Sequence, residues 1–241
     1  NEKVGEYIAQ VTGAEAGMVV SGAAGGVVLS NAACMTGKNV GFVRQLPNTT
    51  GMKNELAIQK IHRGGYSDMY TFAGAKFNEA GSVNGCLAEE LDLAINENTA
   101  AVAYLFGPGV LTNGLTLIEV SEIAHARGVP VIVDAAAMLP PKSNLRQYIV
   151  DGADLVTMSG GKYIRGPQGA GLLFGRKDLI EAATLNTAPN HSIGRPQKVT
   201  KDEMIGLHTA LKLFMESDDE AQFAAYRETL APVQEKLKNV Q

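Results

Sequence analysis

The chain alternates two kinds of apolar pattern. Short continuous apolar runs are typical of buried strands, and longer segments with apolar residues three or four positions apart are typical of helices. The short runs predict strands over 17–20, 40–44, 69–72, 100–106, 131–134, 155–158 and 169–174. The longer segments predict helices over 2–11, 23–35, 54–61, 87–95, 115–127 and 177–185, and helix from about 202 to the end. This alternation predicts an α/β fold with a mostly parallel, seven-stranded sheet flanked by helices.

Two of the predicted strands lead directly to residues that carry chemistry. Strand 131–134 ends in Asp134, and strand 155–158 leads through a Ser-Gly-Gly turn to Lys162, 28 residues further on. Both residues lie at or just beyond the carboxyl end of a strand, where ligands bind in open α/β sheets. Pyridoxal phosphate (PLP) requires such a pair. A lysine holds the cofactor as a Schiff base, and a carboxylate keeps its pyridine nitrogen protonated.

Each of these residues also has a plainer interpretation. A lone lysine is usually a solvated surface charge, and an acid after a strand commonly caps the next helix. Lys162, however, follows two glycines and precedes Tyr163, a setting that favours a partly desolvated amine and a close approach of the backbone to a ligand. Asp134 is followed by three alanines, and the small side chain of Ala136 leaves room for a flat ring. We therefore predict that Lys162 and Asp134 hold the cofactor.

The start of the predicted helix 23–35 is a candidate phosphate site. Residues 21–26 read Ser-Gly-Ala-Ala-Gly-Gly at a strand-to-helix transition. Free backbone amides and the helix dipole favour an anion at such a place. Ser21, Gly22 and Ala23 are the predicted contacts. The glycine spacing is not that of a dinucleotide fold or a Walker A loop. The alternative to a phosphate site is that these glycines only allow the helix to pack closely.

Two further residues are candidates for the site. His62 lies in a glycine-containing turn from which its ring could cover the cofactor ring, or it is an exposed loop histidine. Arg195, in the polar loop 187–198, could bind a substrate carboxylate or phosphate through both guanidinium nitrogens, or it is an ordinary surface arginine. No group of His, Cys and Asp has metal-ligand spacing, so no metal site is predicted.

The composition narrows the range of functions. The chain has 241 residues, of which 45% are hydrophobic and 19% are charged, as is typical of a soluble globular protein. No apolar run approaches the roughly 20 residues of a membrane span. The chain also does not open on a basic segment followed by an apolar one, so we expect a cytoplasmic protein without membrane association. The net charge of −4 argues against a broad nucleic-acid surface.

These motifs together resemble one known family, the selenocysteine synthase-like group of fold-type-I PLP-dependent enzymes. The similar segments are VIVDAAA (131–137), DGADLVTMSGGK (151–162), GPQGAG (166–171), GRPQKVTK (194–201) and residues 7–16 leading to 21–24. The resemblance implies an aspartate aminotransferase-like large domain over 1–200. It implies that 201–241 is a helical segment leading to a small C-terminal domain that the chain lacks.

The resemblance also implies roles for individual residues and for partners. Lys162 becomes the Schiff-base lysine, Asp134 its pyridinium partner, and Ser159 joins residues 21–23 as a phosphate contact. Members of this group are dimers or larger, so a homodimer at least is expected, with residues of a neighbouring subunit completing the cofactor site.

Three functions follow as hypotheses. The first is a PLP-dependent lyase that removes a β-hydroxyl and ammonia from a hydroxy or amino sugar acid such as D-glucosaminate-6-phosphate. The second is β-replacement like that of L-seryl-tRNA(Sec) selenium transferase. The third is a catalytically silent subunit with the same fold. The acidic balance and the lack of a basic stretch with interleaved aromatics favour a small-molecule substrate over tRNA.

Overall fold

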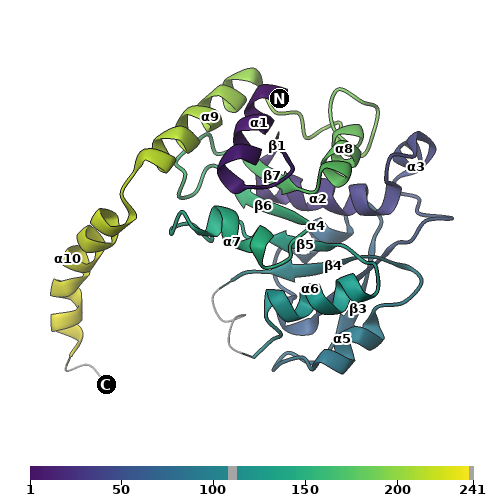
Figure 1. The fold of residues 1–241 in the computed structure, drawn as a ribbon, viewed down its shortest axis with the longest axis horizontal. Helices are drawn as coiled ribbons and strands as arrows, with labels where there is room; N and C mark the ends of the chain where they lie inside the picture. Colours follow the sequence, from purple (N-terminus) through teal and green to yellow (C-terminus); the bar gives the residue numbers. More distant parts are fainter. Residues whose placement is uncertain (108–112, 239–241) are drawn as a thin grey trace.

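The sheet lies between two layers of helices in the computed structural model, which describes residues 1–107 and 113–238 (Figure 1). Its strands are β1 (Ala16–Val20), β2 (Glu55–Gln59), β3 (Lys76–Ala80), β4 (Thr99–Leu105), β5 (Val131–Asp134), β6 (Leu155–Ser159) and β7 (Gly171–Gly175). They are ordered β1-β7-β6-β5-β4-β2-β3. Strand β7 is antiparallel to both of its neighbours, and the other pairs are parallel. The predicted α/β class with a mostly parallel, seven-stranded sheet is confirmed.

Helices cover both faces of this sheet. One face is covered by α1 (Glu2–Thr12), α5 (Ala88–Ala94), α6 (Leu117–Ala126), α7 (Asn144–Val150) and α9 (Lys201–Glu216). The other is covered by α2 (Gly22–Thr36), α4 (Ser67–Thr71) and α8 (Lys177–Leu185). Burial on both faces explains why the central strands are apolar almost throughout. In the described part of the chain, no helix is both long and apolar enough to cross a membrane.

The C-terminal region is helical, as predicted. After α9, helix α10 (Asp219–Leu237) extends away from the body, and none of its residues is buried (Figure 1). Asp218 begins α10 because its carboxylate accepts the amides of Glu220 and Ala221. Residues 239–241 lie outside the described residues.

Three predicted elements are wrong, and all lie between β1 and β4. Residues 40–44 form helix α3 (Val40–Gln45), because the Asn39 side chain accepts the amides of Gly41 and Phe42 and so caps a helix there. The predicted helix 54–61 is instead strand β2 followed by the 3₁₀ turn η1 (Lys60–His62). The predicted strand 69–72 belongs to helix α4.

Two elements were not predicted. Strand β3 lies at the edge of the sheet and carries the sequence KFNEA, whose polar side chains hide the strand pattern. Helix α7 is short and follows a proline-containing turn. The total of seven strands therefore agrees with the prediction although two of the seven were misplaced.

The glycines of α2 let that helix approach the sheet closely. A Cβ at Gly26 would lie 2.0 Å from Thr157 Oγ1 of β6. We expect Gly26→Ala to lower the free energy of unfolding by about 1–3 kcal/mol through overpacking, although alanine favours the helix itself. Urea unfolding would measure this loss. Gly64→Ala, where no atom lies within 4 Å, is the control. A Gly26→Ala protein as stable as the parent would contradict the close approach.

Candidate active site

The carboxyl ends of β5 and β6 meet the N-terminus of α2 at one edge of the sheet. Asp134, the last residue of β5, pairs in register with Thr157 of β6. Thr157 donates its hydroxyl to the carbonyl oxygens of Ala23 (3.3 Å) and Leu172 (3.2 Å), which ties the first turn of α2 to the sheet. The topology thus places the two predicted cofactor residues and the predicted phosphate segment at the same edge.

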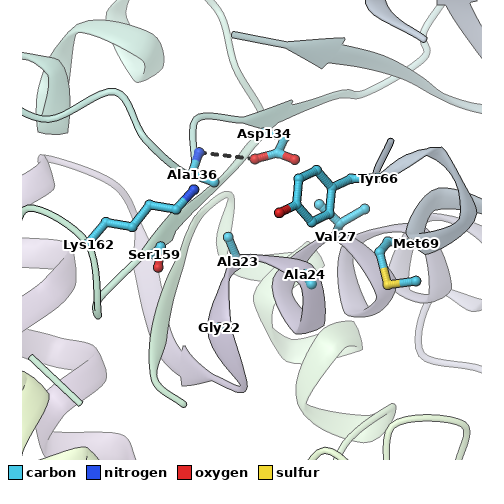
Figure 2. A pocket seen from close by; sticks show the side chains of 10 residues that line it. All are labelled: Gly22, Ala23, Ala24, Val27, Tyr66, Met69, Asp134, Ala136, Ser159 and Lys162. Atoms are coloured by element: carbon cyan, nitrogen blue, oxygen red, sulfur yellow. Dashed lines mark hydrogen bonds between the residues drawn. The ribbon is translucent and has the colours of Figure 1, made fainter. Parts of the chain in front are cut away.

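A cavity opens to solvent at this place. The space in and directly above it, including the part open to solvent, is about 540 Å³. Figure 2 shows the side chains that line it. They come from α2, from α4 and the residue before it, and from the carboxyl ends of β5 and β6 with the segments that follow them. The lining residues are Gly22, Ala23, Ala24, Val27, Tyr66, Met69, Asp134, Ala136, Ser159 and Lys162.

Asp134 is buried at the inner end of the cavity, with 5% of its surface exposed. Its Oδ1 accepts the amide hydrogen of Ala136 at 3.0 Å. Oδ2 makes no hydrogen bond within the described part of the chain, so it is available to a ligand. Burial raises the pKa of the Asp134 carboxyl, while the Ala136 amide and the charge of Lys162 lower it in part. A cation placed against this carboxylate would favour its charged form and so offset the effect of burial on its pKa.

Lys162 approaches the cavity from the opposite side and points its amine toward Ala136 (Figure 2). Its side chain is exposed in the single chain, which differs from the desolvated amine expected from the sequence. The preceding glycines are required by packing within the protein. A Cβ at Gly160 would lie 2.4 Å from Leu207 Cδ1, and one at Gly161 would lie 2.6 Å from Gln168 Cα. These glycines therefore fix the course of the loop that carries the lysine.

The N-terminus of α2 offers donors for an anion. Ser21 is the N-cap residue, but its side chain makes no capping hydrogen bond. Gly22 has φ +64, in the left-handed region, and a Cβ at Gly171 would lie 2.5 Å from the Gly22 carbonyl carbon. The first amides of a helix have no partner within it, so the amides of Gly22, Ala23 and Ala24 are available to a phosphate, whereas the Gly25 amide donates to the Ser21 carbonyl. Ser159 lines the same cavity from the end of β6.

His62 lies beneath this edge and not among the residues that line the cavity. It is 2% exposed, its ring packs edge-on against Tyr104 at 4.5 Å, and its Nδ1 accepts the amide of Leu105 at 3.2 Å. Burial lowers the pKa of His62 to about 4. Tyr66, which the same turn carries, is the aromatic residue that lines the cavity.

The buried neutral His62 gives a pH dependence with a defined sign. The unfolded chain takes up this proton below about pH 6.5 and the folded chain only below about pH 4, so acid favours unfolding between these values. From pH 7.5 to 4.5 we expect His62 to remove about 2–3 kcal/mol of stability. Urea unfolding of His62→Gln should show a smaller loss over this interval, with His191→Gln as the exposed control. Equal losses in the parent and in His62→Gln would refute the assignment.

Arg195 also lies away from the cavity. It lines two neighbouring hollows, one with Arg44 and His191 and the other with Lys198 and Lys201. The loop 187–198 nevertheless reaches the site segment, because Gln197 Oε1 is 3.4 Å from where a Cβ of Gly25 would lie. Across residues 1–107 and 113–238, no three His, Cys, Asp or Glu side chains are grouped to hold a metal ion.

Four lining residues had not been predicted from the sequence: Ala24, Val27, Tyr66 and Met69. Ala24 directly follows the predicted contact Ala23 on α2. Val27 lies one helical turn beyond Ala23, so helical spacing could have identified it. Tyr66 follows two glycines directly, a position from which an aromatic side chain can turn over a ligand. Met69 had been placed in a strand, which removed it from consideration.

The set of donors fits PLP. An acid with one open oxygen, a lysine on the opposite side and a helix N-terminus lie around one cavity, and they match the cofactor's pyridine nitrogen, aldehyde and phosphate. Small side chains at Ala23 and Ala136 leave the space between them open.

Comparison with known proteins gives three kinds of relative. The sequence matches the family described as SelA, L-seryl-tRNA selenium transferase, over residues 1–240. It is 33% identical to D-glucosaminate-6-phosphate ammonia lyase of Salmonella typhimurium, covering 99% of this chain and 63% of that protein. It is 32% identical to 5'-C-glycyluridine monooxygenase-decarboxylase of a Streptomyces species, covering 99% and 60%. L-seryl-tRNA(Sec) selenium transferase of Aquifex aeolicus is 30% identical, with 88% and 46% covered.

Solved structures agree with the sequence comparison. The fold matches that of D-glucosaminate-6-phosphate ammonia-lyase with a TM-score of 0.84 and 32% identity, covering 99% of this chain and 63% of that chain. The PLP-dependent protein YhfS of Escherichia coli matches with a TM-score of 0.63 and 18% identity over 87% of this chain and 52% of the other, a likeness of fold alone. The chain thus spans less than two thirds of the length of these relatives.

Proposed function

The chain belongs to the L-seryl-tRNA selenium transferase (SelA) family, as its motifs had indicated, and we propose that it is the cofactor-binding part of a PLP-dependent enzyme. The observation that carries this proposal is the cavity in which Lys162, Asp134 and the N-terminus of α2 meet. Membership of this family, whose motifs resemble those of PLP-dependent enzymes, supports the same cofactor.

Each part of the site has a separate task in this proposal. The Lys162 amine binds the cofactor covalently and later moves a proton at the α-carbon of the substrate. The Asp134 carboxylate holds a proton on the pyridine nitrogen. The amides of residues 22–24 and the hydroxyls of Ser21 and Ser159 bind the phosphate. When bound, PLP withdraws electrons from the substrate's α-carbon, which makes its proton acidic and lets a β-substituent leave.

We propose a lyase reaction on an amino acid that bears a β-hydroxyl, with an amino sugar acid as the leading substrate. Similarity to D-glucosaminate-6-phosphate ammonia lyase along 99% of the chain supports this substrate class. The net charge of −4 favours a small substrate over tRNA. Arg195 is the proposed contact for an acidic substrate group that extends beyond the cavity, toward the hollow that Arg195 shares with Lys198.

The test is a substrate panel with the full-length, PLP-loaded protein. D-glucosaminate-6-phosphate and its unphosphorylated form should yield ammonia and a keto acid, the phosphorylated form faster. Oxygen uptake with carbon dioxide release from a glycyl nucleoside would instead support chemistry like that of the Streptomyces relative. Tight binding of seryl-tRNA that weakens steeply with salt would support the selenium transferase alternative. A protein that binds PLP but turns over none of these substrates would support the silent-subunit hypothesis.

We further propose that the enzyme is a homodimer or larger. Tyr66 lines the cavity yet is 68% exposed in the single chain, so the mouth of the site is open to a neighbouring subunit. Light scattering on the full-length protein tests this, and a mass of one chain at micromolar concentration would refute it.

A further inference from the structure

Helix α10 is tied to the loop that carries the candidate lysine. The hydroxyl of Tyr163, the residue after Lys162, donates a hydrogen bond to Gln222 Oε1 of α10. The hydroxyl of Tyr226, one turn further along α10, lies 2.7 Å from that of Tyr163. Because Tyr163 directs its own proton to Gln222, Tyr226 is the donor in the second bond. Tyr163 is therefore bonded to α10 both as donor and as acceptor.

The ring of Tyr163 is also held from two other sides. It packs edge-on against Phe214 of α9, with ring centroids 6.0 Å apart at 82°. The guanidinium of Arg165 lies 5.8 Å from its centroid. The side chain is half-buried among these groups. Contacts to two helices and to its own loop thus fix the position of Tyr163.

The loop itself is held in a strained conformation. Arg165 has φ 60 and is the one non-glycine residue with positive φ among the described residues. Its amide donates to the Lys162 carbonyl at 3.0 Å, and the Gly166 amide donates to the Gly160 carbonyl at 2.8 Å. A left-handed conformation at such a residue is unfavourable and persists only where surrounding contacts hold it. Tyr163 lies inside this turn and supplies such contacts.

A second connection joins α10 to the segment that follows Asp134. The Lys142 amide donates to Asp219 Oδ2 at 2.7 Å. The side-chain ammonium of Lys142 donates to the carbonyl oxygens of Met215 (3.2 Å) and Ser217. The segments that follow both cofactor-site strands therefore converge on the junction between α9 and α10.

We propose that Tyr163 is a positioning residue that couples the placement of α10 to the reactivity of Lys162. This inference rests on the proposed role of Lys162 as the cofactor lysine. Any movement of α10 pulls on the Tyr163 hydroxyl through Gln222 and Tyr226, and Tyr163 is joined to Lys162 by a single peptide bond. Since the turn is strained, loss of these contacts lets it relax and redirects the lysine.

The test measures the lysine directly, without turnover. PLP-free full-length protein is acetylated with a small amine-reactive acetyl donor, acetic anhydride, over a range of pH. Labelling of Lys162 is quantified by mass spectrometry against the exposed Lys76. Hydrogen exchange over 219–237 is recorded in parallel. The variants are Tyr163→Phe, Tyr226→Phe and the two combined, with Thr229→Ala as the control on α10, since the Thr229 hydroxyl bonds only within its own helix.

We expect each single variant to change the labelling rate of Lys162 by about three- to tenfold, the effect of one lost hydrogen bond. The change in the double variant should differ strongly from the product of the two single changes, because both substitutions remove the same hydrogen bond. Thr229→Ala should leave it unchanged. Faster exchange in α10 with unchanged labelling of Lys162 would show that Tyr163 only anchors the helix and would overturn the proposal, as would no change in either measurement. Because no PLP is present, the result stands apart from any failure of the proposed reaction.

Discussion

Lys162→Ala is expected to abolish covalent cofactor binding and to lower turnover by at least about 10³-fold. The alanine has no amine to bind PLP or to move the substrate α-proton. The parent protein with PLP should show a visible absorption band that borohydride bleaches, and the reduced protein should carry the cofactor's added mass on the Lys162 peptide. The variant should show neither signal.

The matched control is Lys76→Ala, which removes an exposed lysine from the edge strand β3. It should keep the band, the mass and the activity of the parent. If the cofactor mass appears on another lysine, or if Lys162→Ala keeps the band, the assignment of the site is wrong. Because Lys162 is exposed, its replacement should leave the free energy of unfolding of the PLP-free chain within about 0.5 kcal/mol, so a lost signal would not be explained by unfolding.

The sequence predicts the central part of the fold and site well because local signals and tertiary context agree there. The apolar strands β4, β5 and β6 are buried on both faces, and each reads as a continuous apolar run. Asp134 ends one such run, and Lys162 follows another after a Ser-Gly-Gly turn. Parallel neighbours bring their carboxyl ends to the same edge, so strand prediction alone brings the two residues together.

The prediction fails where the sequence lacks the decisive interaction. Strand β2 has the buried run Leu56–Ile58, which is also a good helix pattern, and only its pairing with β3 and β4 makes it a strand. The same segment leads to His62, whose position depends on this pairing. Once β2 and η1 are in place, the ring lies in the core under Tyr104, and the next turn carries Tyr66 to the cavity.

Asp134→Asn is the second change with a large expected effect. Asparagine keeps an acceptor for the Ala136 amide but carries no charge, so it cannot hold a proton on the pyridine nitrogen of the cofactor. We expect turnover to fall by about 10²–10⁴-fold, the range of a lost proton-holding group, while Lys162 still binds the cofactor. The absorption band should therefore remain, which distinguishes this variant from Lys162→Ala.

The same substitution should stabilise the PLP-free chain. Burial raises the folded-state pKa of Asp134 above its ordinary value, so ionisation costs stability as the pH rises above that value and costs nothing below it. Asparagine removes this cost. The free energies of unfolding of variant and parent should agree near pH 3 and diverge in favour of the variant toward pH 7. Glu97→Gln, an exposed carboxyl at the far end of the sheet, should show no such divergence. An Asp134→Asn chain less stable than the parent at pH 7 would mean that the folded chain already stabilises the carboxylate. A cationic ligand would then not be required to stabilise it, which would contradict the proposed role of Asp134.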